Sequence, residues 1–164
     1  MKNQAFLLKF SIFSFVIVAI LGVLMRYKIA FSLPFVEQKH LQEAHSHFAF
    51  YGFITSCIYI LVAQYLSKTV EEIQMKKYQI LIGINFFASY GMLLSFLYAG
   101  YFWLSIIFST IALLNSFVYY FFLHRDLKNL QETSKIWFLA AFFFFFLSSL
   151  GVFTLSYMMA TKNV

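Results

Sequence analysis

The stretch from Tyr78 to His124 reads YQILIGINFFASYGMLLSFLYAGYFWLSIIFSTIALLNSFVYYFFLH and contains no Lys, Arg, Asp or Glu. As a single α-helix it would be roughly 69 Å long, twice the thickness of the bilayer hydrocarbon. It must therefore fold back, and Gly100 within YAGYFW is the expected hinge. The run predicts two membrane-spanning helices, over 78–98 and 103–123.

Three further apolar runs are long enough to span a bilayer: Ala5 to Met25, Ala44 to Ser67 and Ile136 to Thr161. The 164 residues are 62% hydrophobic and only 11% charged, whereas a soluble domain has about 25% charged residues. We therefore predict an all-α, polytopic integral membrane protein with five transmembrane helices in a bundle. The helices are expected near 5–25, 45–66, 78–98, 103–123 and 136–159, in a single membrane domain covering 1–164.

The distribution of basic residues predicts the orientation, because cytoplasmic loops carry more Lys and Arg. With five spans, the helix ends and loops fall on two sides of the membrane, and these sides carry unequal numbers of basic residues. The side of the N-terminus holds Lys2, Lys9, Lys68, Lys76, Lys77, Arg125, Lys128 and Lys135, and the other side holds Arg26, Lys28, Lys39 and Lys162. This favours a multi-pass protein of the cytoplasmic membrane with its N-terminus in the cytoplasm and its C-terminus outside.

Several function classes are disfavoured by the residues themselves. The net charge of +6 comes from loop residues that flank helices, so it does not indicate nucleic-acid binding. Cys57 is the single cysteine, which excludes an internal disulfide. The spans contain no Asp, Glu or Arg, which proton pumps and ion-coupled transporters usually need. No nucleophile motif or phosphate-binding loop is present, so the chain shows no complete catalytic centre.

The stretch AHSHFAFYGF places His45 and His47 at the start of the second predicted span. Residues two apart on an α-helix differ by about 200° in direction, so these imidazoles are expected to face different neighbours. His40 and Glu43 lie just before them. Ionisable residues at membrane depth are candidates for function, although histidines at the interface also satisfy themselves with water and headgroups.

A stripe of small residues continues below His45 on the same helical face and includes Ala49, Gly52 and Ser56. Gly52 and Ser56 form a small-xxx-small pair, which allows a close approach by another helix or by a flat cofactor. The stripe therefore fits both helix packing, against a partner membrane subunit or a second copy, and the face of a porphyrin. Asn85 and Asn115 are expected to form interhelical hydrogen bonds.

The AHSHFAFYGF stretch resembles the helix of heme-copper oxidase subunit I that begins with H-x-H, especially in the nitric oxide reductase and cbb3-type branches. The resemblance covers about ten residues. It implies that His45 corresponds to the ligand of the high-spin heme and His47 to the ligand of the low-spin heme. It also implies an outer-face site on a helix that runs inward, which agrees with the predicted orientation.

The chain lacks other parts of that family's site. Beyond the histidine pair only His40 and His124 remain, and His124 is predicted at the cytoplasmic side. The resemblance therefore implies a reduced relative or a fragment of a longer chain. A single b-type heme needs only axial ligands such as His/His or His/Met. The methionines expected near the outer ends of the helices are Met25, Met92, Met158 and Met159.

Three hypotheses follow. The leading one is a heme-binding, heme-copper-oxidase-like redox protein with His45 and His47 as axial ligands. The second is a non-enzymatic membrane subunit or assembly factor that packs through the small-residue stripe of Ala49, Gly52 and Ser56. The third is a copper-handling membrane protein, because imidazole and thioether ligands suit copper. Its ligands would be His40, His45, His47 and Met25.

Overall fold

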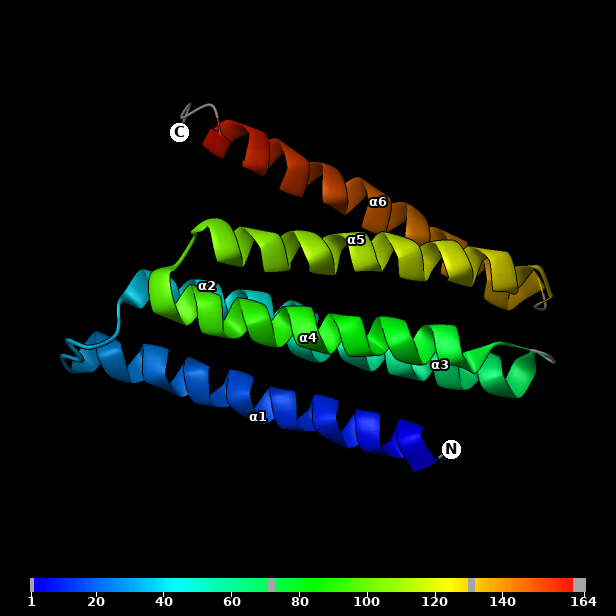
Figure 1. Cartoon of the computed structure of the whole chain (residues 1–164), viewed down its shortest axis with the longest axis horizontal. Helices are drawn as coiled ribbons and strands as arrows, with labels where there is room; N and C mark the ends of the chain where they lie inside the picture. The colour runs from blue at the N-terminus through cyan, green and yellow to red at the C-terminus, as the bar shows by residue number, and fades with distance from the viewer. Residues whose placement is uncertain (1, 71–72, 130–131, 161–164) are drawn as a thin grey trace. The chain divides into compact units, whose positions relative to one another are not determined.

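The computed structural model describes residues 2–70, 73–129 and 132–160, and these residues form helices and turns without a β-strand (Figure 1). The elements, in chain order, are α1 (Lys2–Ala30), α2 (Gln38–His47), the π-helix η1 (Phe48–Thr55), α3 (Ser56–Thr69), α4 (Met75–Ala99), α5 (Trp103–Asp126), the 3-10 helix η2 (Leu127–Asn129) and α6 (Glu132–Ala160).

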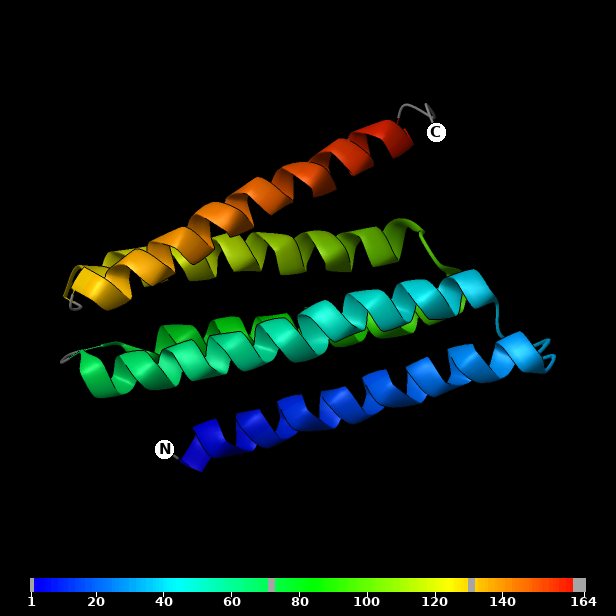
Figure 2. The same cartoon turned by 180° about the vertical axis from the view of Figure 1, so that it is seen from behind.

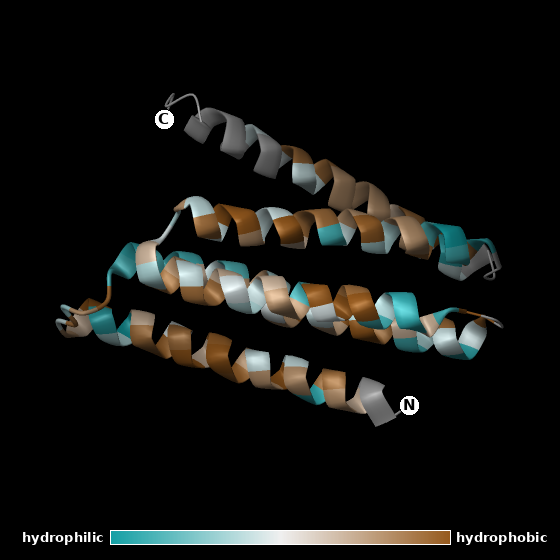
Figure 3. Ribbon diagram, in the orientation of Figure 1, coloured by the Kyte–Doolittle hydropathy of each residue, from teal (hydrophilic) through white to brown (hydrophobic). Residues whose placement is uncertain are grey.

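The predicted all-α class is confirmed. Within the described residues five helices are long and apolar enough to cross a membrane. They are α1, the continuous helix formed by α2, η1 and α3, then α4, α5 and α6. Figure 3 shows hydrophobic residues along most of α1, whereas hydrophilic residues gather at the start of α2.

The second of these helices begins at Gln38, earlier than the predicted start near residue 45. Glu37 is the extended residue that precedes it, and the Lys28 ammonium donates to the carbonyl oxygens of Leu33 and Val36 in the preceding turn. Gln, Lys, Leu, Glu and Ala are good helix formers, so the polar segment before the apolar run continues the same helix. His40 and Glu43 therefore lie on the helix that carries His45 and His47.

By its internal packing the chain divides into two compact units, Met1–Tyr119 and Tyr120–Val164. Within the first unit, α4 packs along the helix from α2 to α3, and α1 packs against α2, η1 and α3 (Figures 1 and 2). The core of this unit combines residues from α1, α2, η1, α4 and α5, namely Val18, Leu21, Leu41, Ala44, Phe48, Ala88, Met92, Leu93, Phe96 and Ala112.

The predicted hinge at Gly100 is confirmed. Gly100 follows the last residue of α4 with φ +61°, which L-residues with a Cβ rarely adopt. Its N–H donates to the Phe96 carbonyl oxygen at 2.9 Å. Ser105 closes the turn, because its hydroxyl accepts from the Phe102 N–H and donates to the Gly100 carbonyl oxygen.

Gly52 lies directly beneath the ring of Phe48, one turn earlier in the same helix. A Cβ at Gly52 would lie 2.5 Å from Phe48 Cε2, and the Phe48 side chain is fully buried. Gly52→Ala is therefore expected to destabilise the protein by about 1–3 kcal/mol, because the buried ring would have to shift to make room for the methyl group. Thermal unfolding in detergent should show this. Gly83→Ala is the control, since a Cβ there meets nothing within 4 Å, and an equal melting temperature for both variants would contradict the packing.

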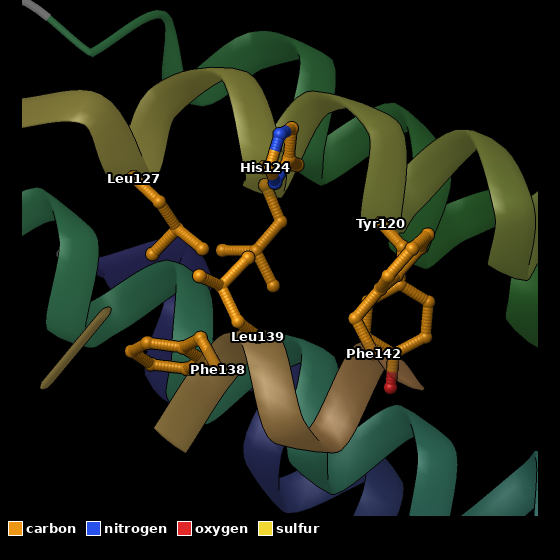
Figure 4. Close-up of a pocket in the computed structure, with 7 residues that line it drawn as sticks. Tyr120, His124, Leu127, Phe138, Leu139 and Phe142 are labelled. Atoms are coloured by element: carbon orange, nitrogen blue, oxygen red, sulfur yellow. The ribbon is translucent and has the colours of Figure 1, made fainter. Parts of the chain in front are cut away.

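The second unit contains the end of α5, η2 and α6. Tyr120 lies against Phe142 and Phe145, with ring centroids 5.6 Å and 4.7 Å apart. His124 stacks loosely on Phe142 at 6.5 Å. Figure 4 shows the shallow hollow between these elements, lined by Tyr120, Leu123, His124, Leu127, Phe138, Leu139 and Phe142. It leaves no room for a water molecule, so we assign it no ligand.

Candidate functional site

His45 lies on the side of α2 that faces α1. Its Nδ1 atom lies 3.1 Å from the carbonyl oxygen of Val18. A carbonyl oxygen only accepts hydrogen bonds, so Nδ1 must carry the hydrogen and donate it. In the neutral imidazole the other nitrogen, Nε2, then has a free lone pair. Metal-binding histidines in proteins commonly have this arrangement, in which the second ring nitrogen donates to a backbone carbonyl.

Gly22 makes room for the His45 ring on α1. A Cβ at Gly22 would lie 3.3 Å from His45 Cε1, closer than most side-chain contacts. Val18 and Gly22 are one turn apart, so they present a carbonyl and an uncovered backbone on the same face of α1. Sequence reasoning missed both residues. A glycine within an apolar helix was the available signal, but nothing in the sequence linked it to His45.

His47 points to the turn between α4 and α5. Its Nε2 atom lies 2.7 Å from the Tyr101 hydroxyl oxygen. Its ring stacks on Phe96 with centroids 4.4 Å apart and planes inclined by 6°. The two imidazoles therefore contact different helices, as the 200° separation predicts. The Nε2 atom of His47 therefore already has a hydrogen-bond partner.

His40 and Glu43 both lie against the backbone of Gly100. A Cβ at Gly100 would be 2.7 Å from His40 Nε2 and 3.0 Å from Glu43 Oε2. His40 also pairs with Glu37, whose Oε2 atom lies 3.2 Å from His40 Nε2. Glu43 Oε2 is buried and has no hydrogen-bond partner among the described residues. The absent side chain of Gly100 is what allows this close contact.

Tyr101 follows Gly100 directly and lies outside the spans. Burial and, secondarily, the negative charge of Glu43 raise the pKa of its phenol above the usual value. The hydroxyl thus keeps its proton and can donate it to His47 at neutral pH.

The raised pKa predicts an alkaline titration that Tyr101→Phe removes. The phenol ionises in the unfolded chain at about pH 10 but only above that in the folded protein. Its contribution to stability is therefore present below pH 10 and is lost as the pH rises through the folded-state pKa. The absorbance change of ionising tyrosine, measured as wild type minus Tyr101→Phe, is expected to have its midpoint above pH 10. A midpoint at or below pH 10 would contradict the partial burial that raises this pKa.

The four proposed copper ligands do not converge. His45 faces α1, whereas His40 and His47 face the Gly100 turn. Met25 is half-buried and packs against the core. Across the described parts of the chain no three His, Cys, Asp or Glu side chains form a group that would hold a metal ion. Met92 is fully buried in the core, and the side chains of Met158 and Met159 lie outside those described.

The small-residue stripe lies inside the first unit. Ala49 packs against the core, Gly52 is covered by Phe48, and Ser56 is fully buried. The Ser56 hydroxyl accepts a hydrogen bond from Asn85 Nδ2 on α4 at 2.9 Å. The space above these residues is therefore filled by the protein's own side chains and helices.

The π-helix η1 follows His47 immediately, and sequence reasoning did not predict it. Its eight residues lie between two α-helical segments. In such a helix the hydrogen bonds run between residues five apart, and π segments often lie at functional sites. Asn85 Nδ2 donates to the Tyr51 carbonyl oxygen of this segment at 2.8 Å. The expected interhelical hydrogen bond of Asn85 is thus present, but its target is the π-helix backbone.

In comparisons with known proteins, the chain matches no family model, no curated protein and no solved structure.

Proposed function

We propose that the chain is a heme-binding membrane protein in which His45 Nε2 is an axial ligand of the iron. The hydrogen bond from His45 Nδ1 to the Val18 carbonyl oxygen carries this proposal. It directs the free lone pair to Nε2 and orients the ring, as outer hydrogen bonds do for metal-binding histidines. His47 is not assigned as a ligand, because its Nε2 atom is engaged by Tyr101.

We propose the cytoplasmic membrane as the location, with the N-terminus inside and the C-terminus outside. Five helices of spanning length support insertion, and the excess of Lys and Arg on one side supports the orientation. The first helix leaves large apolar side chains exposed along its length, as a lipid-facing helix does, including Phe6, Ile12, Phe13, Phe15, Val16, Ile20 and Val23.

A bound heme would supply one-electron oxidation and reduction. The residues of this chain would hold and orient it. His45 would hold it through its imidazole. Further ligands of an oxidase-like centre would come from a partner membrane subunit or a second copy, so we propose electron transfer and not a complete catalytic centre.

A copper site and a helix-docking groove receive less support from the geometry. A copper site would need His40, His45 and His47 to face one point. His45 instead faces α1, whereas His40 and His47 lie toward the Gly100 turn. A helix-docking groove would need free space above Gly52, which Phe48 fills, and the same contact excludes a porphyrin from this stripe, so a heme held by His45 would lie elsewhere.

The test is the heme content of protein purified in detergent from heme-replete cells. The reduced-minus-oxidised visible spectrum is expected to show the α-band of a b-type heme, at up to one heme per chain. A flat spectrum, in protein that binds no added hemin, would overturn the proposal.

A further inference from the structure

The direction in which the two histidines point depends on the π-helix between α2 and α3. A helix with bonds between residues five apart turns less per residue than an α-helix. Each residue that changes from one form to the other would therefore rotate α2 about its axis relative to α3. Because His45 and His47 end α2, such a rotation would redirect both imidazoles.

Buried side chains from two neighbouring helices bind the backbone of η1. Asn85 of α4 is fully buried and donates from Nδ2 to the Tyr51 carbonyl oxygen at 2.8 Å and to Ser56 Oγ at 2.9 Å. Ser56 Oγ in turn donates to the same carbonyl oxygen at 3.1 Å. From α1, Ser11 Oγ lies 3.3 Å from the Phe53 carbonyl oxygen, to which it can donate, and 3.1 Å from Cys57 Sγ. In a regular α-helix these two carbonyls would accept the N–H groups four residues later; here the Phe53 carbonyl oxygen also accepts the Ser56 N–H, three residues later.

The amide of Asn85 is the central group in this arrangement. One of its donated hydrogen bonds goes to the Tyr51 carbonyl oxygen within η1 and the other to Ser56 at the start of α3, whereas its Oδ1 atom is buried and has no partner among the described residues. Buried polar atoms are usually hydrogen-bonded, so the unpaired Oδ1 atom shows that this position does not satisfy every polar atom of the Asn85 amide. Its position is instead accounted for by the bonds to Tyr51 and Ser56.

We propose that Asn85 is a positioning residue that holds η1 in its π form and thereby sets the rotation of α2 and the direction of His45 and His47. The consequence for the iron rests on the proposed heme function. The rotation itself does not, so it can be measured in protein without heme.

The experiment measures distances between pairs of nitroxide labels in a Cys57→Ser background. One pair, at Gln42 and Tyr98, joins α2 to α4 beside the histidines, and both residues are exposed. The control pair, at Leu61 and Phe87, joins α3 to α4 on the other side of η1 and is also exposed. Asn85→Leu is expected to shift or broaden the first distance distribution by several ångströms and to leave the second unchanged.

Ser56→Ala provides a second variant if Asn85→Leu does not fold. It keeps Asn85 but removes one acceptor and one donor at the junction, so a smaller shift of the first pair alone is expected. An unchanged Gln42–Tyr98 distance in a folded variant would overturn the proposal, and so would equal changes in both pairs. If the Gln42–Tyr98 distance shifts but the protein binds no heme, the positioning role of Asn85 is supported and only the heme function is contradicted.

Discussion

Protein with His45→Ala is expected to lose its b-type heme, with the heme-to-chain ratio falling by at least about tenfold. The imidazole would be the axial ligand, and its orientation comes from the Val18 carbonyl at 3.1 Å. Alanine can neither bind the iron nor replace that hydrogen bond. The ratio is measured from the visible spectrum against protein concentration after purification in detergent.

His47→Ala is the matched control, because it removes the same side chain two residues away. Its Nε2 atom is engaged by the Tyr101 hydroxyl, and its ring stacks on Phe96. We expect this variant to retain heme within about twofold of wild type, with a lower melting temperature from the lost stacking. Loss of heme from His47→Ala, with retention in His45→Ala, would reverse the assignment.

Gly100→Ala is expected to lower the free energy of unfolding by about 2–5 kcal/mol, the combined cost of a strained backbone and of overpacking. Gly100 has φ +61° and ψ −137°, a conformation close to one that only glycine adopts readily. A Cβ would also lie 2.5 Å from His40 Cδ2. Thermal unfolding followed by the loss of helical circular dichroism measures the effect.

Gly83→Ala serves again as the comparison. This glycine lies inside α4 with open space around it, and alanine is the better helix former by about 1 kcal/mol. It should therefore leave stability unchanged or raise it slightly. A melting temperature for Gly100→Ala equal to that of Gly83→Ala would contradict the contact between the turn and His40.

Features that depend on local periodicity were predictable from the sequence. Long runs without charge predict helices of spanning length, because the bilayer hydrocarbon favours apolar side chains and a backbone whose polar groups are all hydrogen-bonded. The length of the run from Tyr78 to His124 requires a reversal, and a glycine near its middle is the residue that tolerates the turn. The different neighbours of His45 and His47 follow from the helical rotation of 100° per residue alone.

Features that depend on tertiary contacts were not predictable. The sequence does not indicate that His45 meets Val18 and Gly22, or that His40 and Glu43 meet Gly100, because these partners are distant in the chain. The π-helix has no sequence signature of its own. It becomes explicable only when Asn85 of α4 is seen to bind the Tyr51 carbonyl oxygen.

A stripe of small residues can be covered either by a partner or by the protein's own side chains. Small side chains allow close approach, but the sequence does not specify what approaches. Here Phe48 from the same helix covers Gly52, and Asn85 reaches Ser56. The residues predicted to receive a partner helix or a porphyrin are thus occupied by internal contacts.

The most direct test of His45 as an axial ligand is imidazole rescue of His45→Gly. The reduced-minus-oxidised spectrum of this variant is recorded without and with free imidazole, beside the wild type. We predict that the b-type α-band is absent without imidazole and returns when imidazole occupies the vacated position. An α-band in His45→Gly identical to that of the wild type, before any imidazole is added, would contradict the ligand assignment.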